Sequence, residues 1–206
     1  MESKGRTQEQ RSAATRQALV AAGRRLWAER GYAEVGTPEI AAAAGVTRGA
    51  MYHQFADKAD LFLAVAEAVE QDVMTRLVAG VDGSGADSPA AALRAAVEPW
   101  LSICVDPEVR QLLLLDAPSV LGWKKYRDIA QRYSLGVTEH LLVEAMDAGQ
   151  LARQPARALA HILIGALDEA AMVIATAEDR DQARAEVGEV LRRLFDGLLT
   201  DPGPRS

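Results

Sequence analysis

The sequence has little cysteine and no long uninterrupted apolar run. Its only cysteine is Cys104, so one chain cannot form an internal disulfide, and a reducing compartment is expected. The N-terminus is polar and contains no apolar segment of the signal-peptide type. The most apolar run, Leu159 to Ile174, is interrupted by Asp168 and Glu169, which argues against a membrane span. We therefore expect a cytoplasmic protein that does not enter the membrane.

The sequence also lacks the motifs of common enzyme classes. It has no glycine-rich phosphate loop, no nucleophile elbow and no paired metal-ligand motif. The three histidines, His53, His140 and His161, lie far apart in the sequence, and Cys104 has no neighbouring base. We predict that the protein is not an enzyme and that it needs no cofactor and no metal.

The net charge of −6 is unevenly distributed along the 206 residues. Residues 1–60 contain nine lysines and arginines against seven acidic residues, whereas the remainder contains fourteen against twenty-two. A basic N-terminal part on an acidic body suits a protein that meets phosphate with one end only.

Helical periodicity runs through nearly the whole sequence, and no segment shows sustained strand alternation. We expect an all-α fold of about nine helices. The expected domains are an N-terminal domain of three helices at residues 1–58 and a helical body at residues 59–206. The expected helices include residues 12–30, 37–45, 47–54, a fourth from 57, one from 89 with a kink at Pro99, one from 106, and 121–148, 155–177 and 179–199, with a linker at 80–88.

The segment 37–58 predicts a helix-turn-helix. Thr37 followed by Pro38 is typical of a capped helix start. Gly45 suits the tight turn, and Thr47 is expected to cap the second helix. The outward face of this second helix is expected to carry Arg48, Gly49, Tyr52 and His53, because Met51 and Phe55, four residues apart, face the core. A guanidinium, a phenol and an imidazole on one exposed face are suited to a DNA major groove.

Further residues extend this motif into a longer pattern. The pattern comprises the run Ala21–Tyr32 and then Thr37, Ile40, Ala41, Ala44, Gly45, Val46, Gly49, Tyr52, Phe55, Lys58 and Leu61. With these residues the segment from Thr15 to Val69 resembles the DNA-binding domain of the TetR/AcrR family of transcriptional regulators. The sequence departs from the family at Trp27, where phenylalanine is usual, and at Pro38, where some relatives have a polar residue that contacts DNA.

The resemblance implies which residues meet DNA. Thr37 would bind phosphate at a helix N-terminus, and Lys58 would neutralise a phosphate. Thr47, Arg48, Gly49, Tyr52 and His53 would lie on the recognition helix, and Arg11 and Arg16 would reach the flanking backbone or the minor groove. The residues alone leave other roles open: Tyr52 as a half-buried core residue, Lys58 as a helix cap, and the arginines and His53 as solvated surface.

The last two expected helices are apolar on more than one face, which indicates a subunit interface. We predict a two-fold interface of four helices, two from each chain, while a purely internal core remains the alternative. The predicted interface residues are Leu159, Ile162, Leu163, Ala166, Leu167, Ala170, Val187, Val190, Leu191, Leu194, Phe195 and Leu198.

An aromatic stripe on the helix 121–148 suggests a ligand pocket opposite the helix that Pro99 kinks, although such a stripe is more often plain core. The predicted pocket residues are Trp100, Cys104, Trp123, Tyr126, Tyr133 and His140. Together with the resemblance, these features predict a homodimeric repressor that binds a palindromic operator in double-stranded DNA and is released by a small-molecule effector. An activator, or a helical interaction protein that does not bind an operator, are the alternatives.

Overall fold

The computed structural model describes residues 8–199, and within that range every regular element is a helix. The segments are α1 (Gln8–Arg30), α2 (Thr37–Ala43), α3 (Arg48–Gln54), α4 (Lys58–Gly83), α5 (Pro89–Ala95), α6 (Val97–Cys104), α7 (Pro107–Val109), the π-helical η1 (Arg110–Asp116), α8 (Ala117–Leu121), α9 (Trp123–Asp147), α10 (Ala156–Thr176) and α11 (Arg180–Leu198). When segments that continue into one another are counted as one helix, residues 8–199 contain nine helices. The prediction of an all-α fold of about nine helices is confirmed.

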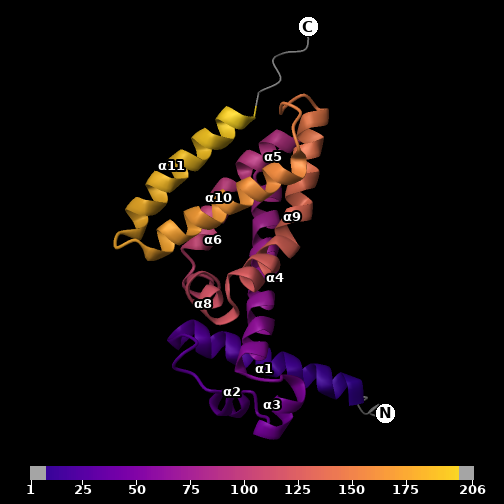
Figure 1. Ribbon diagram of the computed structural model, residues 1–206, viewed down its shortest axis with the longest axis vertical. Coiled ribbons are helices and arrows are strands. Elements are labelled where there is room, and N and C mark those ends of the chain that lie inside the picture. Colours follow the sequence, from indigo (N-terminus) through magenta and orange to yellow (C-terminus); the bar gives the residue numbers. More distant parts are fainter. Residues whose placement is uncertain (1–7, 200–206) are drawn as a thin grey trace.

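The first three helices form one end of the molecule, and α4 connects this end to the body (Figure 1). The helix α1 lies across the start of α4, with α2 and α3 beyond it. In the body, α10 packs between α9 and α11. The helix-turn-helix therefore lies at the opposite end of the molecule from the C-terminal end of α11.

The core of the N-terminal end is built around Trp27. This residue is fully buried on α1, in contact with the rings of Tyr32 and Phe62, whose centroids lie 5.5 and 5.3 Å from its own. Its Nε1 donates a hydrogen bond to the carbonyl of Val35 at 3.2 Å. The tryptophan thus serves as an ordinary core residue, and its ring nitrogen is satisfied where burial would otherwise be costly.

Several helix boundaries differ from those expected. The helix α4 continues to Gly83, so the predicted linker from residue 80 is too long at its start. The kink at Pro99 is confirmed: α5 and α6 are separated at Ala96, because the proline nitrogen cannot donate to the carbonyl four residues earlier. The helix expected from residue 121 begins at Trp123, after Gly122 turns the chain with a φ of +78°.

Polar contacts join the helix-turn-helix end to the body. The guanidinium of Arg24 on α1 pairs with Glu108 at 2.7 Å and also with Asp72. The backbone N–H of Tyr32 donates to Asp116 at 2.9 Å, at the end of η1. The buried cluster around Trp27 also continues past the predicted boundary at residue 58 into α4 and η1. These contacts connect α1 and its C-terminal end directly to α4, α7 and η1.

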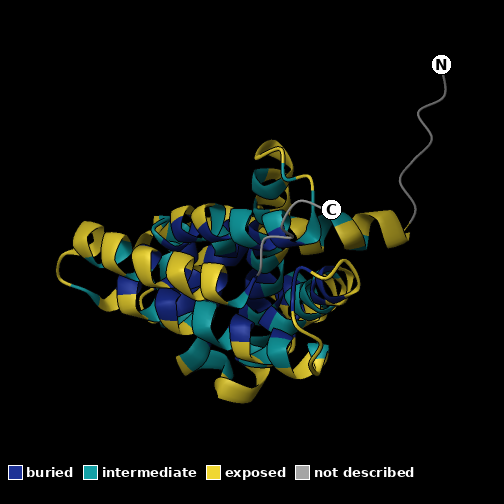
Figure 2. Ribbon diagram, turned by 90° about the horizontal axis from the view of Figure 1, so that it is seen from above, coloured by how far each residue is buried: buried dark blue, intermediate teal, exposed yellow. Residues whose placement is uncertain are grey.

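The outer turns of the body are largely exposed, while the buried segments lie along its middle (Figure 2). By length and composition alone, the helix α10 could cross a membrane, since the mean hydropathy of its most apolar stretch is 1.7. Of this stretch, 39% is buried inside the protein. Asp168 and Glu169 lie within this helix, where a bilayer would make their charges costly. Its contacts with α9 and α11 identify it as a helix of the folded body.

Candidate DNA-binding surface and internal cavity

The helices α2 and α3 are joined by the predicted tight turn. Gly45 adopts a φ of +68°, which a residue with a Cβ atom rarely adopts, and the N–H of Val46 donates to the carbonyl of Ala41 at 2.9 Å. Thr47 caps α3 as predicted, because its hydroxyl accepts from the N–H of Ala50 at 3.1 Å. Met51 is fully buried, which anchors one face of α3 and leaves the other to solvent.

Tyr52 lies at the centre of the exposed face of α3. Its ring is 44% exposed, and its hydroxyl shares a hydrogen bond of 3.3 Å with the hydroxyl of Thr37 on α2. The guanidinium carbon of Arg48 lies 5.5 Å from the centre of the same ring. The hydrogen bond with Thr37, followed by the neighbouring Arg48, lowers the pKa of Tyr52. These contacts orient Tyr52 and Arg48 together on one surface.

Thr37 differs from its predicted position. It is the first residue of α2, and Gly36 occupies the cap position without a side-chain hydrogen bond. The Thr37 side chain is buried, and its hydroxyl meets Tyr52 instead of the helix amides. The prediction that Thr37 caps α2 is therefore wrong, and a contact between its hydroxyl and phosphate stays a prediction.

The remaining predicted DNA contacts fall into two groups. Thr47, Gly49 and His53 are exposed on or beside α3. Lys58 is partly buried: its Nζ donates to the carbonyl of Tyr32 at 2.6 Å and lies 4.0 Å from the centre of the Tyr32 ring. Burial lowers the pKa of Lys58. Lys58 thus connects α4 to the end of α1, and its contact with phosphate also stays a prediction.

The two arginines of α1 that the sequence assigned to flanking DNA are on the same end of the molecule. Arg11 is exposed. The guanidinium of Arg16 stacks on the Phe55 ring, 4.2 Å from its centre, and donates to the carbonyl of Gln54 at 3.3 Å. Arg16 therefore supports the end of α3, in addition to any contact with DNA.

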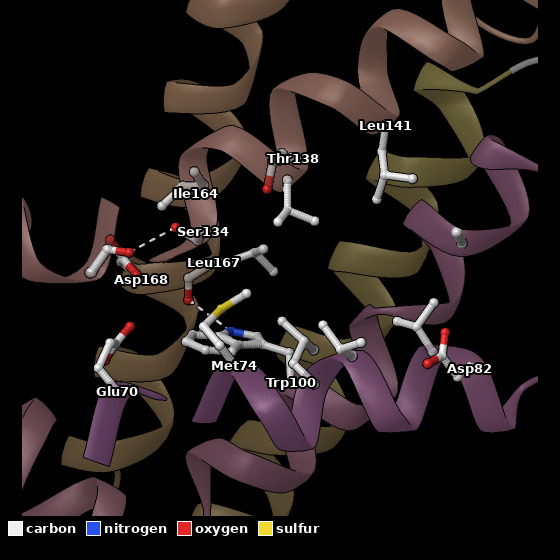
Figure 3. Close-up of a pocket in the computed structure, with 16 residues that line it drawn as sticks. Glu70, Met74, Asp82, Trp100, Ser134, Thr138, Leu141, Ile164, Leu167 and Asp168 are labelled. Carbon is white, nitrogen blue, oxygen red and sulfur yellow. Dashed lines mark hydrogen bonds between the residues drawn. The ribbon is translucent and has the colours of Figure 1, made fainter. Parts of the chain in front are cut away.

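The body contains a cavity of about 310 Å³ between α4, α5, α6, α9 and α10, whose lining includes the solvent-exposed Val78 and Val137 (Figure 3). Its walls are mainly apolar. They are formed by Met74, Leu77, Val78, Val81, Ala92, Trp100, Ala130, Val137, Leu141, Ile164 and Leu167, with Ser134, Thr138, Glu70, Asp82 and Asp168 as the polar members. A mainly apolar cavity with few polar groups is the usual form of a small-molecule site.

Of the six predicted pocket residues, only Trp100 lines this cavity, where its Nε1 donates to the carbonyl of Leu167 at 3.2 Å. Cys104 is buried in a separate apolar cluster. Trp123 and Tyr126 line a different depression. Tyr133 accepts a hydrogen bond from Gln71, and His140 is exposed beside Glu144. The part of α9 that lines the cavity carries no aromatic ring. Its side chains there are smaller than aromatic rings and therefore leave space open: Ala130, Ser134, Val137, Thr138 and Leu141.

The carboxyl groups of the cavity are not among the residues predicted from the sequence. Glu70 on α4 and Asp168 on α10 lie at the same end of it, as Figure 3 shows. Burial, followed by the charge of Asp168, raises the pKa of Glu70 to about 7. Burial also raises the pKa of Asp168 to about 6, although Arg127 partly offsets this. The available signal was the acidic interruption of the apolar run from Leu159 to Ile174.

The predicted interface residues divide by burial. Four of them, Leu163, Ala170, Leu191 and Phe195, are buried in the core of the single chain and offer little surface to a partner. Their place in a subunit interface stays a prediction. Ile162, Val190 and Leu194 are exposed at 66%, 64% and 41%. The partly buried members are Leu159, Ala166, Leu167, Val187 and Leu198, of which Leu167 also lines the cavity.

Comparisons with known proteins agree with this architecture. Residues 19–65 match the family described as bacterial regulatory proteins, tetR family, and residues 90–198 match the tetracyclin repressor-like C-terminal domain. The chain belongs to the TetR family of transcriptional regulators. A relative is the Transposon Tn10 TetC protein of Escherichia coli, 27% identical over 80% of this chain and 82% of its own length. The AcrR regulator of Shigella flexneri is 35% identical over 53% of this chain and 50% of its own length.

Solved TetR-family structures have the same fold. A regulator from Pectobacterium atrosepticum superposes with a TM-score of 0.83 at 33% identity, covering 96% of this chain and 100% of its own. RolR in complex with resorcinol has a TM-score of 0.69 at 22% identity, covering 94% of this chain and 99% of its own. At that identity the second comparison supports the fold alone.

Proposed function

We propose that this TetR-family regulator is a homodimeric repressor, which binds a palindromic operator through α3 and releases it when a small molecule occupies the cavity. The observation that carries the proposal is the exposed face of α3. Arg48 and Tyr52 lie against each other there, with His53 beside them, at the far end of the molecule from α11. Arginine pairs with guanine, and tyrosine and histidine reach bases or phosphate, in major-groove recognition.

A dimer would supply the second recognition helix. One helix-turn-helix of this size binds DNA weakly, whereas two helices about 34–36 Å apart read successive major grooves on one side of the duplex. The exposed apolar side chains Ile162, Val190 and Leu194 on α10 and α11 offer a surface that a second chain would cover. We propose that α10 and α11 of two chains form a four-helix interface.

The cavity would communicate with DNA through α4. This helix lines the cavity with Met74, Leu77 and Val78, and it begins at Lys58, which contacts the end of α1. A ligand that favours one position of α4 would change the spacing of the two recognition helices. It can shift this equilibrium only by its differential affinity for the two states, typically about 1–3 kcal/mol.

The test begins with genomic fragments retained by the purified protein, which are sequenced and then measured by fluorescence anisotropy. The expected result is specific, salt-dependent binding to an inverted repeat by a dimer. Equal affinity for the fragment and for a scrambled duplex would overturn operator binding in favour of an interaction protein. A reporter gene downstream of the fragment separates repressor from activator, because loss of the regulator raises expression only for a repressor.

A further inference from the structure

The cavity is unusual in the charge of its polar groups. Its lining contains three acidic residues, Glu70, Asp82 and Asp168, and no lysine, arginine or histidine. Asp82 is exposed at the opposite end from Glu70 and Asp168 (Figure 3). An apolar cavity with only acidic charge attracts a cation and repels an anion, and its low dielectric strengthens both effects.

Glu70 and Asp168 have no partner that explains their position. Within residues 8–199, neither carboxyl makes a hydrogen bond or an ion pair, although the two approach the same end of the cavity from α4 and α10. Both side chains are partly buried. Carboxyl groups withdrawn from water are normally paired or hydrogen-bonded, because an unpaired charge out of water is costly. Two such groups at the end of an apolar cavity therefore suggest that the missing partner is a ligand.

The carboxyl groups of Glu70 and Asp168 differ in the charges around them. Asp168 also lines a second depression, together with Arg127, Trp123 and Tyr126, and the charge of Arg127 partly offsets that of Asp168. The neighbours Tyr126 and Cys104 are neutral groups whose pKa values are raised by burial. The charge that acts on Glu70 is that of Asp168, which raises the pKa of Glu70 further after burial. Glu70 is therefore the group with the greater need for a positive partner.

We propose that the cavity binds an apolar molecule with one positively charged nitrogen, which lies between Glu70 and Asp168 while its apolar part lies along α4 and α9. Val78, Val81, Val137 and Leu141 form the wall that the apolar part would contact. The Trp100 ring adds an aromatic surface beside them. This inference rests on the proposed function, because it names the chemical class of the effector for the same cavity.

The test uses three probes with one apolar stem: 4-phenylbutylamine as the cation, 4-phenylbutanol as the neutral molecule and 4-phenylbutyrate as the anion. Isothermal titration calorimetry with the full-length protein at pH 8 measures each affinity. The amine is expected to bind at least tenfold more tightly than the alcohol, and the butyrate is expected to bind most weakly. Equal affinities, tighter binding of the butyrate, or no binding of any probe would overturn the proposal.

Variants locate the cation. Glu70→Gln and Asp168→Asn keep the shape of the side chain, and each is expected to weaken the amine at least fivefold while the affinity for the alcohol stays within twofold. Asp82→Asn is the matched control at the exposed end and should leave the affinity for the amine within twofold. An equal loss in Asp82→Asn, or an unchanged affinity in both Glu70→Gln and Asp168→Asn, would contradict the assignment. Circular dichroism confirms that each variant is folded.

Operator release separates this inference from the proposed function. If the amine binds through Glu70 but leaves operator affinity unchanged at saturation, the cation site stands and the effector role of the cavity fails. If the alcohol or the butyrate releases the operator as well as the amine does, the effector role stands and the preference for a cation fails.

Discussion

Gly80 on α4 lies directly against the ring of Pro99 on α6. A Cβ atom added at Gly80 would lie 2.6 Å from Cγ of Pro99 and 2.7 Å from its Cβ, which is closer than carbon atoms can approach. Because the proline ring is rigid, the two helices would have to separate. The close approach of α4 and α6 at this point therefore depends on glycine.

Gly80→Ala is expected to lower the free energy of unfolding by about 1–3 kcal/mol, the usual cost of overpacking. Gly136→Ala is the matched control on α9, because nothing lies within 4 Å of its added Cβ. It should stabilise the protein by about 0.5–1 kcal/mol through helix propensity. Urea denaturation of both variants measures the difference, and equal stability would refute the close packing against Pro99.

Arg48→Ala tests recognition by α3. If Arg48 pairs with a guanine, its loss should weaken operator binding by about 1–3 kcal/mol and relax the preference at one base position, with a smaller effect on random DNA. Arg153→Ala is the control, since Arg153 lies in the exposed loop between α9 and α10, in an ion pair with Asp147 and away from α3. Anisotropy titrations with operator and random duplexes compare the two. Equal losses on both duplexes would assign Arg48 to phosphate instead.

Glu70→Gln tests the buried carboxyl through the pH dependence of stability. The pKa of Glu70 is raised to about 7, so the folded state holds a proton that the unfolded state releases at lower pH. The free energy of unfolding of the wild type should therefore fall as the pH rises from about 5 to about 8. The glutamine variant should lose much of this fall and be more stable than wild type by about 1–3 kcal/mol at pH 8.

The control for this experiment is Glu178→Gln in the exposed loop between α10 and α11. Thermal unfolding at pH 5 and pH 8 should give the control the same pH dependence as the wild type. A Glu70→Gln variant with an undiminished fall in stability would show that this carboxyl does not carry the effect.

The sequence predicts the helix-turn-helix well because its signals are local. Gly45 at a positive φ, Thr47 as a cap and the buried Met51 each act within a few residues, and all three are found as expected. The cavity could not be predicted in the same way. Its walls come from five helices, and the aromatic stripe of α9 only partly faces it, so that Val137 lines it while Tyr133 contacts Gln71.

The interface prediction shows the same limit on α10 and α11. Apolar spacing on a helix identifies residues that avoid water, but it does not distinguish the core of one chain from a contact between two. Leu191 and Val190 are neighbours in the sequence, yet the first is buried in its own chain and the second is exposed. The distinction depends on how α11 is rotated against α10 and α6, which long-range packing decides.

Val190 and Leu194 are exposed apolar residues of α11 that a second chain would cover. If α10 and α11 form the proposed dimer interface, Val190→Asp and Leu194→Asp, alone and together, are expected to give a monomer, because an aspartate there would place unpaired charge in an apolar interface. Val143→Asp is the control at an exposed apolar residue of α9. Light scattering after size exclusion measures the mass, and operator affinity should fall with the loss of the dimer. A folded double variant that remains dimeric would place the subunit contact on another surface of the chain.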